Sequence, residues 1–308
     1  MDEFGLIQKF FVGHWPQSED LVAGIGDDGA VLRPSPGCET VAAVDAMVEG
    51  VHFLSSIDPG DLGYRLVAVN LSDMAAMGAT PRWMTLSLAI PEADPGWLRR
   101  FSQGMRECAE SDGVALIGGD TTRARVTVVS LQMLGEVPEG QALLRSGARP
   151  GDAIYTTGHP GDAAAGLDAR MQGDAGSELY DAFARPVSRV AYGRQLRGVA
   201  HAAIDTSDGL FADLGKLVES SGVGATLAID QLPLSDALLA RCGREEAVDF
   251  ALSGGDDYEL LFVADGPPPE NQDVTVTRIG EIVTGSGIGC TQDGEPFAYE
   301  DSGYLHFQ

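Results

Sequence analysis

The sequence predicts a two-domain protein in which both halves are α/β or α+β. The chain has 308 residues, a length that suits one large domain or two ordinary ones. Segments with strand and helix patterns alternate along it. A turn-rich stretch without a long apolar run, residues 139–152, lies near the middle. We therefore expect a domain of residues 1–140 and a second of residues 141–308.

The first half is expected to contain two long helices and a sheet. Residues 59–79 begin with proline and carry an apolar stripe at helical spacing, on which Asp73 also falls. A second helix is predicted from about 95 to 111, followed by a short buried strand, VALI, and then the segment GGDTTR. The β-branched run VTVVSLQMLGEV predicts a central strand.

The second half continues the alternation of strands and helices. Strands are predicted at IYTTG, AAID, ATLAID, YELLFVAD and TVTRIGEIV. Helices are predicted at 161–171, 185–200 and 206–222, with a short one from Ser235. No short-period repeat of the solenoid type is present.

The charge balance restricts the partners of the chain. It has 20 basic and 46 acidic residues, a net charge of −26, which repels nucleic acid and anionic membranes. A phosphorylated ligand must then be met by arginines or bound metal, since Lys9 and Lys216 are the only lysines. The start of the chain is acidic and no apolar run is long enough for a membrane span, so we expect a cytoplasmic protein. The four scattered cysteines form no C-x-x-C pair and predict isolated thiols.

The segment GIGDDG, residues 24–29, matches the glycine pattern of dinucleotide-binding loops but not their context. Such a loop must lead into a helix, and the following AVLRPSPG contains two prolines that prevent one. Neither lysine lies in a P-loop, and the strand lysine and H-R-D loop of protein kinases are missing. These three nucleotide-binding classes are therefore excluded.

Carboxylates beside glycines recur along the chain instead. They occur in GDD at 26–28, VDAMVEGVH at 44–52, NLSD at 70–73, GGD at 118–120, DTSDG at 205–209 and GGDD at 254–257. Mg²⁺ prefers oxygen ligands and commonly bridges one or two aspartates to substrate phosphates. A Mg²⁺ between Asp27, Asp28 and a ligand would reverse the sign of the site. The pattern predicts a magnesium-dependent phosphate site.

Each motif also has a simpler interpretation when it is taken alone. A GDD turn is usually solvated, and Asp208 at the start of a helix is usually a cap. His52 can be an ordinary histidine, and Arg145 an ordinary surface cation. Asp73 is harder to explain, because a carboxylate on an apolar helix face is costly to bury unless it is paired or bound to metal.

Taken together, the motifs resemble those of the thiamine-monophosphate kinases, within the wider superfamily of aminoimidazole ribonucleotide synthetase-like ATP enzymes. The matching segments are GIGDDGAV, DAMVEGVHF, NLSDMAAMGATP, GGDTTR, LLRSGARPGD, AIDTSDGL, LSGGDDYELLF, IGEI and GYLHF, which cover nearly the whole chain. The resemblance implies an N-terminal sheet domain that pairs in a homodimer and a C-terminal α/β domain. It also implies transfer of the γ-phosphoryl group of ATP to thiamine monophosphate, giving thiamine diphosphate and ADP.

The same resemblance implies roles for particular residues. Several Mg²⁺ would be held by Asp28, Asp45, Asp73, Asp120, Asp205 and Asp208. ATP would be contacted by Gly119, Asp120, Arg145 and Ser207, and the thiamine substrate by His52, Asp256 and Tyr304. No general base is expected, because an ionised acceptor phosphate needs none and in-line transfer depends on positioning and charge neutralisation.

Three departures from the family pattern leave details open. Ala43 and Val44 stand where hydroxyl residues are common, which leaves the number of metals open. Asp256 replaces a glutamate, and Leu305 replaces an aspartate beside Tyr304. Two alternative functions remain at this stage. One is an ATP-using enzyme of the same superfamily with another phosphate acceptor, and the other is a non-catalytic acidic metal-binding protein.

Overall fold

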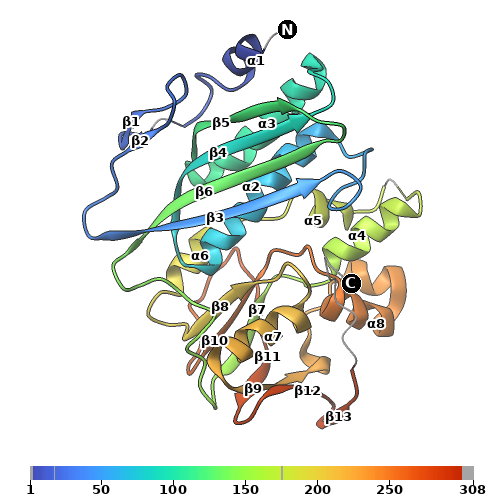
Figure 1. Cartoon of the computed structure of the whole chain (residues 1–308). Helices are drawn as coiled ribbons and strands as arrows, with labels where there is room; N and C mark the ends of the chain where they lie inside the picture. Colours follow the sequence, from blue (N-terminus) through green and yellow to red (C-terminus); the bar gives the residue numbers. More distant parts are fainter. Residues whose placement is uncertain (1–2, 17, 175, 300–308) are drawn as a thin grey trace. The chain divides into compact units, whose positions relative to one another are not determined.

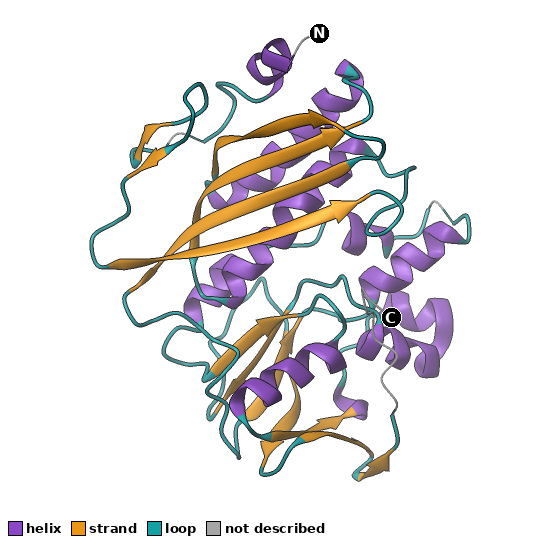
Figure 2. Cartoon of the chain, viewed as in Figure 1, coloured by secondary structure: helices purple, strands orange, loops and turns teal. Residues whose placement is uncertain are grey.

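The structure is a computed structural model that describes residues 3–16, 18–174 and 176–299 (Figure 1). The chain divides into two compact units. Unit 1 comprises the chain up to Met74 together with Ala79–Gly140, and unit 2 comprises Ala75–Gly78 and the chain from Gln141 onward. Each unit is built around its own large sheet (Figure 2).

Unit 1 contains a four-stranded sheet in the order β3-β6-β4-β5. Its strands are β3 (Cys38–Val48), β4 (Thr80–Ile90), β5 (Ala115–Arg123) and β6 (Val128–Pro138). β6 runs antiparallel to both β3 and β4, whereas β4 and β5 are parallel. Parallel neighbours need a crossover connection, and here it is helix α3 (Pro95–Asp112).

Helices α2 (Pro59–Ala76) and α3 lie on one face of this sheet (Figure 1). The two helices approach closely at glycines: a Cβ on Gly63 would overlap the Phe101 carbonyl oxygen, and one on Gly104 would overlap that of Gly60. The apolar stripe predicted for α2 is buried, including Leu66, and Met105 of α3 is buried as well. Because the two helices cross closely, both can pack against the same face of the sheet.

The opposite face of the sheet is partly open. Along β3, the residues of this face alternate with those that face the helices. Ala42, Val44 and Ala46 are exposed, and Val44 has an exposed fraction of 64%. One end is covered by the small sheet of β1 (Leu21–Ala23) and β2 (Val31–Leu32), which packs near Trp83. Helix α1 (Glu3–Phe10) precedes this small sheet. An apolar strip along β3 is therefore left without cover among the described residues.

Unit 2 contains a seven-stranded sheet in the order β13-β12-β9-β11-β7-β10-β8. All pairs are antiparallel except β12 with β9. The strands are β7 (Ala153–Thr157), β8 (Ala202–Asp205), β9 (Gly224–Ala228), β10 (Leu260–Ala264), β11 (Val276–Val283), β12 (Gly287–Gln292) and β13 (Glu295–Phe297). The helices are α4 (Asp162–Met171), α5 (Tyr180–Ala184), α6 (Val190–Gln195), α7 (Leu210–Ser221), α8 (Asp236–Ser253) and the 3₁₀ turn η1 (Ile229–Gln231).

The main core of unit 2 lies between α7 and the sheet (Figure 1). Leu214 of α7 packs in one cluster with Leu261 and Val263 of β10. Phe262 points to the other face, where its ring lies 6.1 Å from that of Tyr192 on α6. Both faces of the β7, β10 and β8 region are therefore covered.

Most predicted elements are confirmed, with three differences. The segment GGDTTR continues strand β5 instead of following it, because it pairs with β4 as far as Ile90 and Arg123. The helix expected over 185–200 is reduced to α6, and the short helix from Ser235 extends to Ser253 with a non-helical break at Gly243. Ser235 caps that helix by accepting the Leu238 N–H at 3.0 Å. None of the described helices is long and apolar enough to cross a bilayer.

Candidate functional site

The structure brings together three predicted residues of unit 1. Asp45 lies on the helix-facing side of β3, and its carboxyl group is hydrogen-bonded to that of Asp73 on α2. Burial raises the pKa of Asp45, against the opposing effects of Asp73 and of the nearby His52. The His52 ring is oriented by its Nδ1, which accepts the Val48 N–H at 3.1 Å. The carboxylate on the apolar stripe of α2 is thus paired with a second carboxylate.

The donor atoms around this pair suit a hard cation. Asn70, one turn before Asp73 on α2, is fully buried and donates its amide to the Leu66 carbonyl at 2.9 Å. Its Oδ1 has no hydrogen-bond partner among the described residues. Two adjoining carboxyl groups and a nearby buried amide oxygen are the oxygen ligands that Mg²⁺ prefers. No three His, Cys, Asp or Glu side chains of the described residues are grouped to hold a metal, so water or substrate oxygens would complete the coordination.

The GIGDDG loop borders a cavity in unit 1 of about 930 Å³. The walls come from α1 and the residues after it, the loop itself, Leu86 of β4 and the start of β5. Asp28 and Gly119 both line this cavity, and Asp120 follows at an exposed position on β5. Gly119 has φ 155°, and a Cβ there would overlap the Leu86 carbonyl oxygen. Only glycine allows the two strands to pair closely at this point.

In unit 2, two loops that are distant in sequence are hydrogen-bonded to each other. Ser207 in the TSDG loop, which follows β8, accepts the Asp256 N–H at 2.9 Å, and Thr206 accepts the Tyr258 N–H at 2.8 Å. Asp256 and Tyr258 both have positive φ, 64° and 53°. The buried Asp205 ends β8 immediately before this loop. The predicted residues Asp205, Ser207, Asp208 and Asp256 are therefore neighbours.

Two residues that sequence reasoning missed hold the TSDG loop. Asp213 accepts the N–H groups of Ser207 at 2.9 Å and Asp208 at 3.0 Å. Lys216 donates to Asp213 at 2.6 Å and to Asp208 at 2.5 Å. Helix α7 begins after Gly209 without a side-chain cap, so the interpretation of Asp208 as a helix cap is wrong. Asp213 lies on the apolar stripe of α7, and the criterion that singled out Asp73 could have identified it.

The segment after Asp256 is fixed by buried charges. Asp257 accepts the N–H groups of Gly161 at 2.9 Å and Ala163 at 3.3 Å at the start of α4. Burial raises the pKa of Asp257 well above its usual range. Glu259 receives two hydrogen bonds of 2.6 Å from the Arg189 guanidinium, and its backbone is bonded to Thr206. These hydrogen bonds therefore connect the base of the TSDG loop to α4 and to Arg189.

The two remaining predicted residues are less informative. Arg145 is exposed in unit 2, and its carbonyl accepts the Ser221 hydroxyl at 3.2 Å. Tyr304 lies outside the described residues. Cys38, Cys108, Cys242 and Cys290 are all free thiols, as predicted.

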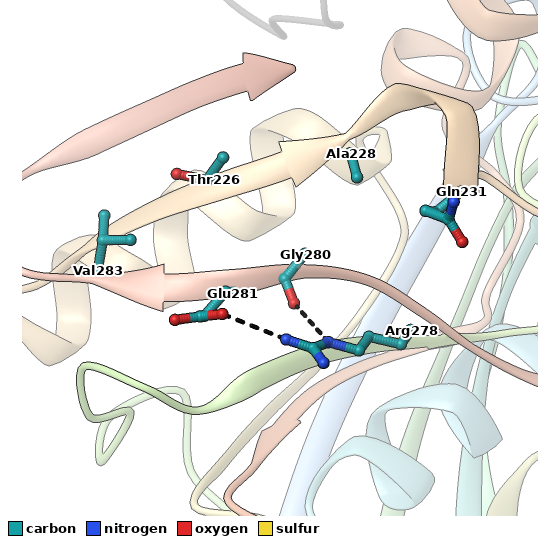
Figure 3. A pocket seen from close by; sticks show the side chains of 7 residues that line it. All are labelled: Thr226, Ala228, Gln231, Arg278, Gly280, Glu281 and Val283. Atoms are coloured by element: carbon teal, nitrogen blue, oxygen red, sulfur yellow. Dashed lines mark hydrogen bonds and ion pairs between the residues drawn. The ribbon is translucent and has the colours of Figure 1, made fainter. Parts of the chain in front are cut away.

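A second cavity, of about 560 Å³, lies on the open face of β9 and β11 (Figure 3). Arg278 extends along it and bonds to Glu281 at 3.2 Å and to the Gly280 carbonyl at 3.4 Å. None of the residues predicted for phosphate or metal binding lines this cavity. The positive charge of Arg278 is balanced locally, so the cavity does not provide a strong anion site.

Comparison with known proteins covers both units. Residues 26–137 match the AIR synthase related protein N-terminal domain, and residues 149–291 match its C-terminal domain. The thiamine-monophosphate kinase of Salmonella typhimurium is 43% identical over 320 residues, covering 99% of this chain and 98% of that protein.

Two solved structures extend this comparison. The crystal structure of thiamine-monophosphate kinase from Stenotrophomonas maltophilia superposes with a TM-score of 0.83 at 42% identity, covering 91% of this chain and 93% of that one. A structure described as AaThiL complexed with AMPPCP and TMP gives a TM-score of 0.80 at 32% identity, covering 89% of each chain. This chain belongs to the thiamine-monophosphate kinases, within the AIR synthase-related family.

Proposed function

We propose that this protein transfers the γ-phosphoryl group of ATP to the phosphate of thiamine monophosphate, giving thiamine diphosphate and ADP. The observation that carries the proposal is the 43% identity to a thiamine-monophosphate kinase across 99% of the chain. The similar structure with AMPPCP and TMP supports ATP as the donor. The cavity and the acidic clusters of unit 1 supply the oxygen-rich surroundings that such a transfer needs.

ATP is proposed to use the unit 1 cavity for part of its binding. Ile7, Phe11 and Leu116 give the cavity an apolar part, which suits a purine base. Gly119, Asp120, Arg145 and Ser207 would contact the nucleotide. The chain has only 20 basic residues, and the Arg145 guanidinium would donate hydrogen bonds to the phosphates and offset part of their negative charge.

Mg²⁺ is proposed to be held by Asp28, Asp45, Asp73, Asp120, Asp205 and Asp208. When bound, it would neutralise the charge of the phosphates and align the reacting groups. The Asp45–Asp73 pair fits this role because two carboxyl groups that share a hydrogen bond can both ionise once a cation lies beside them. Asp28 belongs to the cavity wall and Asp120 adjoins it, which suits a role close to the nucleotide.

The acceptor is proposed to lie against His52, Asp256 and Tyr304. The ring of His52 is held by the Val48 N–H, and the backbone of Asp256 by Ser207, so both residues have fixed starting positions. The acceptor oxygen belongs to an ionised phosphate, and no residue has to remove a proton from it. The task of these side chains is to orient the thiamine part and keep the two phosphates in line.

We also propose that the protein is a cytoplasmic homodimer formed through the open sheet face of unit 1. Val44 is 64% exposed there and lies between the exposed Ala42 and Ala46. Apolar side chains at alternate positions of one strand form a flat surface that a second copy can cover. Light scattering should give a mass about twice 32.3 kDa for the native protein. The variant Val44→Asp should shift it to the single-chain mass; a native protein that is already monomeric would contradict the dimer.

The central experiment incubates purified protein with ATP, Mg²⁺ and thiamine monophosphate and separates the products by chromatography. Asp73→Asn and Asp120→Asn should each lower turnover about 100-fold or more, because phosphoryl transfer depends on positioned metal charge. The matched control is Asp249→Asn, the same change at an exposed position of α8, which should retain full turnover. Thermal unfolding of all variants separates loss of metal binding from loss of folding.

The outcomes distinguish the alternatives. Formation of ADP only with another phosphate acceptor would keep the enzyme class and reject the substrate. Metal binding without phosphorylation of any acceptor in a small panel would favour a non-catalytic metal-binding protein. If Asp73→Asn lost folding to the same extent as turnover, the Asp73 carboxylate would be structural.

A further inference from the structure

Lys216 has an unusual position in a chain that is almost without lysine. Its ammonium lies 2.5 Å from Asp208 Oδ2 and 2.6 Å from Asp213 Oδ1. The Asp213 side chain is 1% exposed, whereas those of Lys216 and Asp208 are each 36% exposed. The ion pair therefore has a buried half, anchored at Asp213, and a half that faces solvent at Asp208.

The buried half is fixed by further hydrogen bonds. Asp213 uses Oδ2 for the N–H groups of Ser207 and Asp208 and Oδ1 for Lys216. Both its oxygens are occupied, so Asp213 keeps its orientation and holds the lysine in place. The Asp208 carboxylate, in contrast, has Oδ2 bonded to Lys216 and sits in the loop that is proposed to bind metal.

The charges set a competition at Asp208. An ammonium and a divalent cation next to the same carboxylate repel each other, and the repulsion is strong within a few ångströms. The Lys216 ammonium already pairs with the Asp208 carboxylate. A cation that binds Asp208 must therefore displace the ammonium or bind beside it with reduced affinity.

We propose that Lys216 is a positioning residue that acts as the counter-ion of Asp208 and exchanges with Mg²⁺ at that carboxylate. The inference deepens the proposed function and depends on its assignment of Asp208 as a metal ligand. Asp213 keeps the lysine tethered after the exchange, so the TSDG loop retains its shape whether or not metal is bound. Lys216 thereby sets the Mg²⁺ concentration at which the site fills.

The scarcity of lysine gives a direct spectroscopic test in the native protein. With lysine labelled by ¹³C at Cε and ¹⁵N at Nζ, the side-chain spectrum contains signals from Lys9 and Lys216 alone. Lys9→Met assigns them. Titration with Mg²⁺ should move the Lys216 signal along the same curve as metal binding measured by calorimetry, and should leave the Lys9 signal in place. A Lys216 signal that stays fixed while the protein saturates with Mg²⁺ would overturn the proposal.

The second test compares Mg²⁺ affinities of variants by calorimetry without nucleotide. Lys216→Met removes the competing charge and should tighten Mg²⁺ binding by about two- to fivefold, which corresponds to the upper part of the range for solvent-exposed ion pairs. Lys9→Met makes the same change in net charge on α1, where Lys9 lies over the Phe10 ring, and should have no effect. Lys216→Arg keeps the charge and should stay within about twofold of the native protein. If Lys216→Met and Lys9→Met changed Mg²⁺ affinity equally, the net charge of the protein would explain the change, and the exchange would be rejected.

Asp208→Asn separates failure of this inference from failure of the proposed function. If Asp208→Asn leaves Mg²⁺ affinity unchanged, Asp208 is not a ligand, and both the metal assignment and the exchange are wrong. If Asp208→Asn weakens binding while Lys216→Met does not tighten it, the metal assignment stands and the exchange alone is rejected. Should Lys216→Met unfold, the spectra of the native protein still decide the question.

Discussion

Removing Arg189 should destabilise unit 2 strongly, because it leaves a buried carboxylate without its charge partner. The Arg189 and Glu259 side chains are 11% and 12% exposed and are joined by two hydrogen bonds of 2.6 Å. Breaking a buried ion pair from one side costs about 3–5 kcal/mol. The Thr157 hydroxyl still donates to Glu259, so we expect Arg189→Met to lower the free energy of unfolding by about 3 kcal/mol, the lower end of that range.

The matched control is Arg278→Met in the same unit. Arg278 pairs with Glu281 at 3.2 Å, but these side chains are 57% and 52% exposed. An exposed ion pair contributes about 0–1 kcal/mol, so Arg278→Met should have little effect. The two substitutions are chemically identical, and burial is the main difference between the two ion pairs.

Unfolding of each unit can be followed by a buried thiol. Cys290, 8% exposed, lies in the core of unit 2, and Cys108, 2% exposed, lies in unit 1. Alkylation in increasing urea, with the modified peptides identified by mass spectrometry, gives a separate transition for each thiol. Arg189→Met should move the Cys290 transition to lower urea than in the native protein. A shift that corresponds to less than about 1 kcal/mol would refute the buried-pair reasoning.

The double variant Arg189→Met with Glu259→Gln provides a further check. Since it removes both charges, it should lose less stability than the two single variants added together. Additive losses would mean that the two side chains do not stabilise each other. Activity should fall with Arg189→Met as well, because the Glu259 backbone is bonded to Thr206 at the base of the TSDG loop.

Two further predictions test the site. Gly119→Ala places a Cβ against the Leu86 carbonyl oxygen at a residue with φ 155°. It should lower the free energy of unfolding by about 1–3 kcal/mol and weaken ATP binding. The control is Gly118→Ala, whose Cβ would meet no atom within 4 Å and which should change the free energy of unfolding by less than about 0.5 kcal/mol. Because the pKa of Asp257 is raised, the folded protein keeps a proton on this carboxyl group at pH values where the unfolded chain has released it. The free energy of unfolding therefore falls as pH rises from the unfolded pKa to the folded pKa, by at most about 1.4 kcal/mol per pH unit. Asp257→Asn should remove this slope, and a difference between native and variant stability that stays constant from pH 4 to 7 would contradict it.

The sequence alone determined the alternation of strands and helices in unit 2, the two long helices of unit 1 and the family, but it did not predict strands β3 and β4. Local pattern was sufficient because apolar periodicity records which side of a helix or strand is buried. The same logic singled out Asp73, whose carboxylate lies on the buried stripe of α2. It misplaced GGDTTR, since a segment rich in glycine and threonine becomes a strand only when a neighbour such as β4 is there to pair with it.

The tertiary structure decided which polar and charged side chains meet. Arg189 and Glu259 are separated by 70 positions in the chain and Ser35 and Glu136 by 101, yet each pair is bonded directly. Such contacts depend on the path of the chain, which no local pattern encodes. In the sequence Lys216 is only one of two lysines, and it is the turn of α7 that places it between Asp208 and Asp213 at the proposed metal site. The sequence identifies the charged residues, but their electrostatic partners depend on distances that only the folded chain determines.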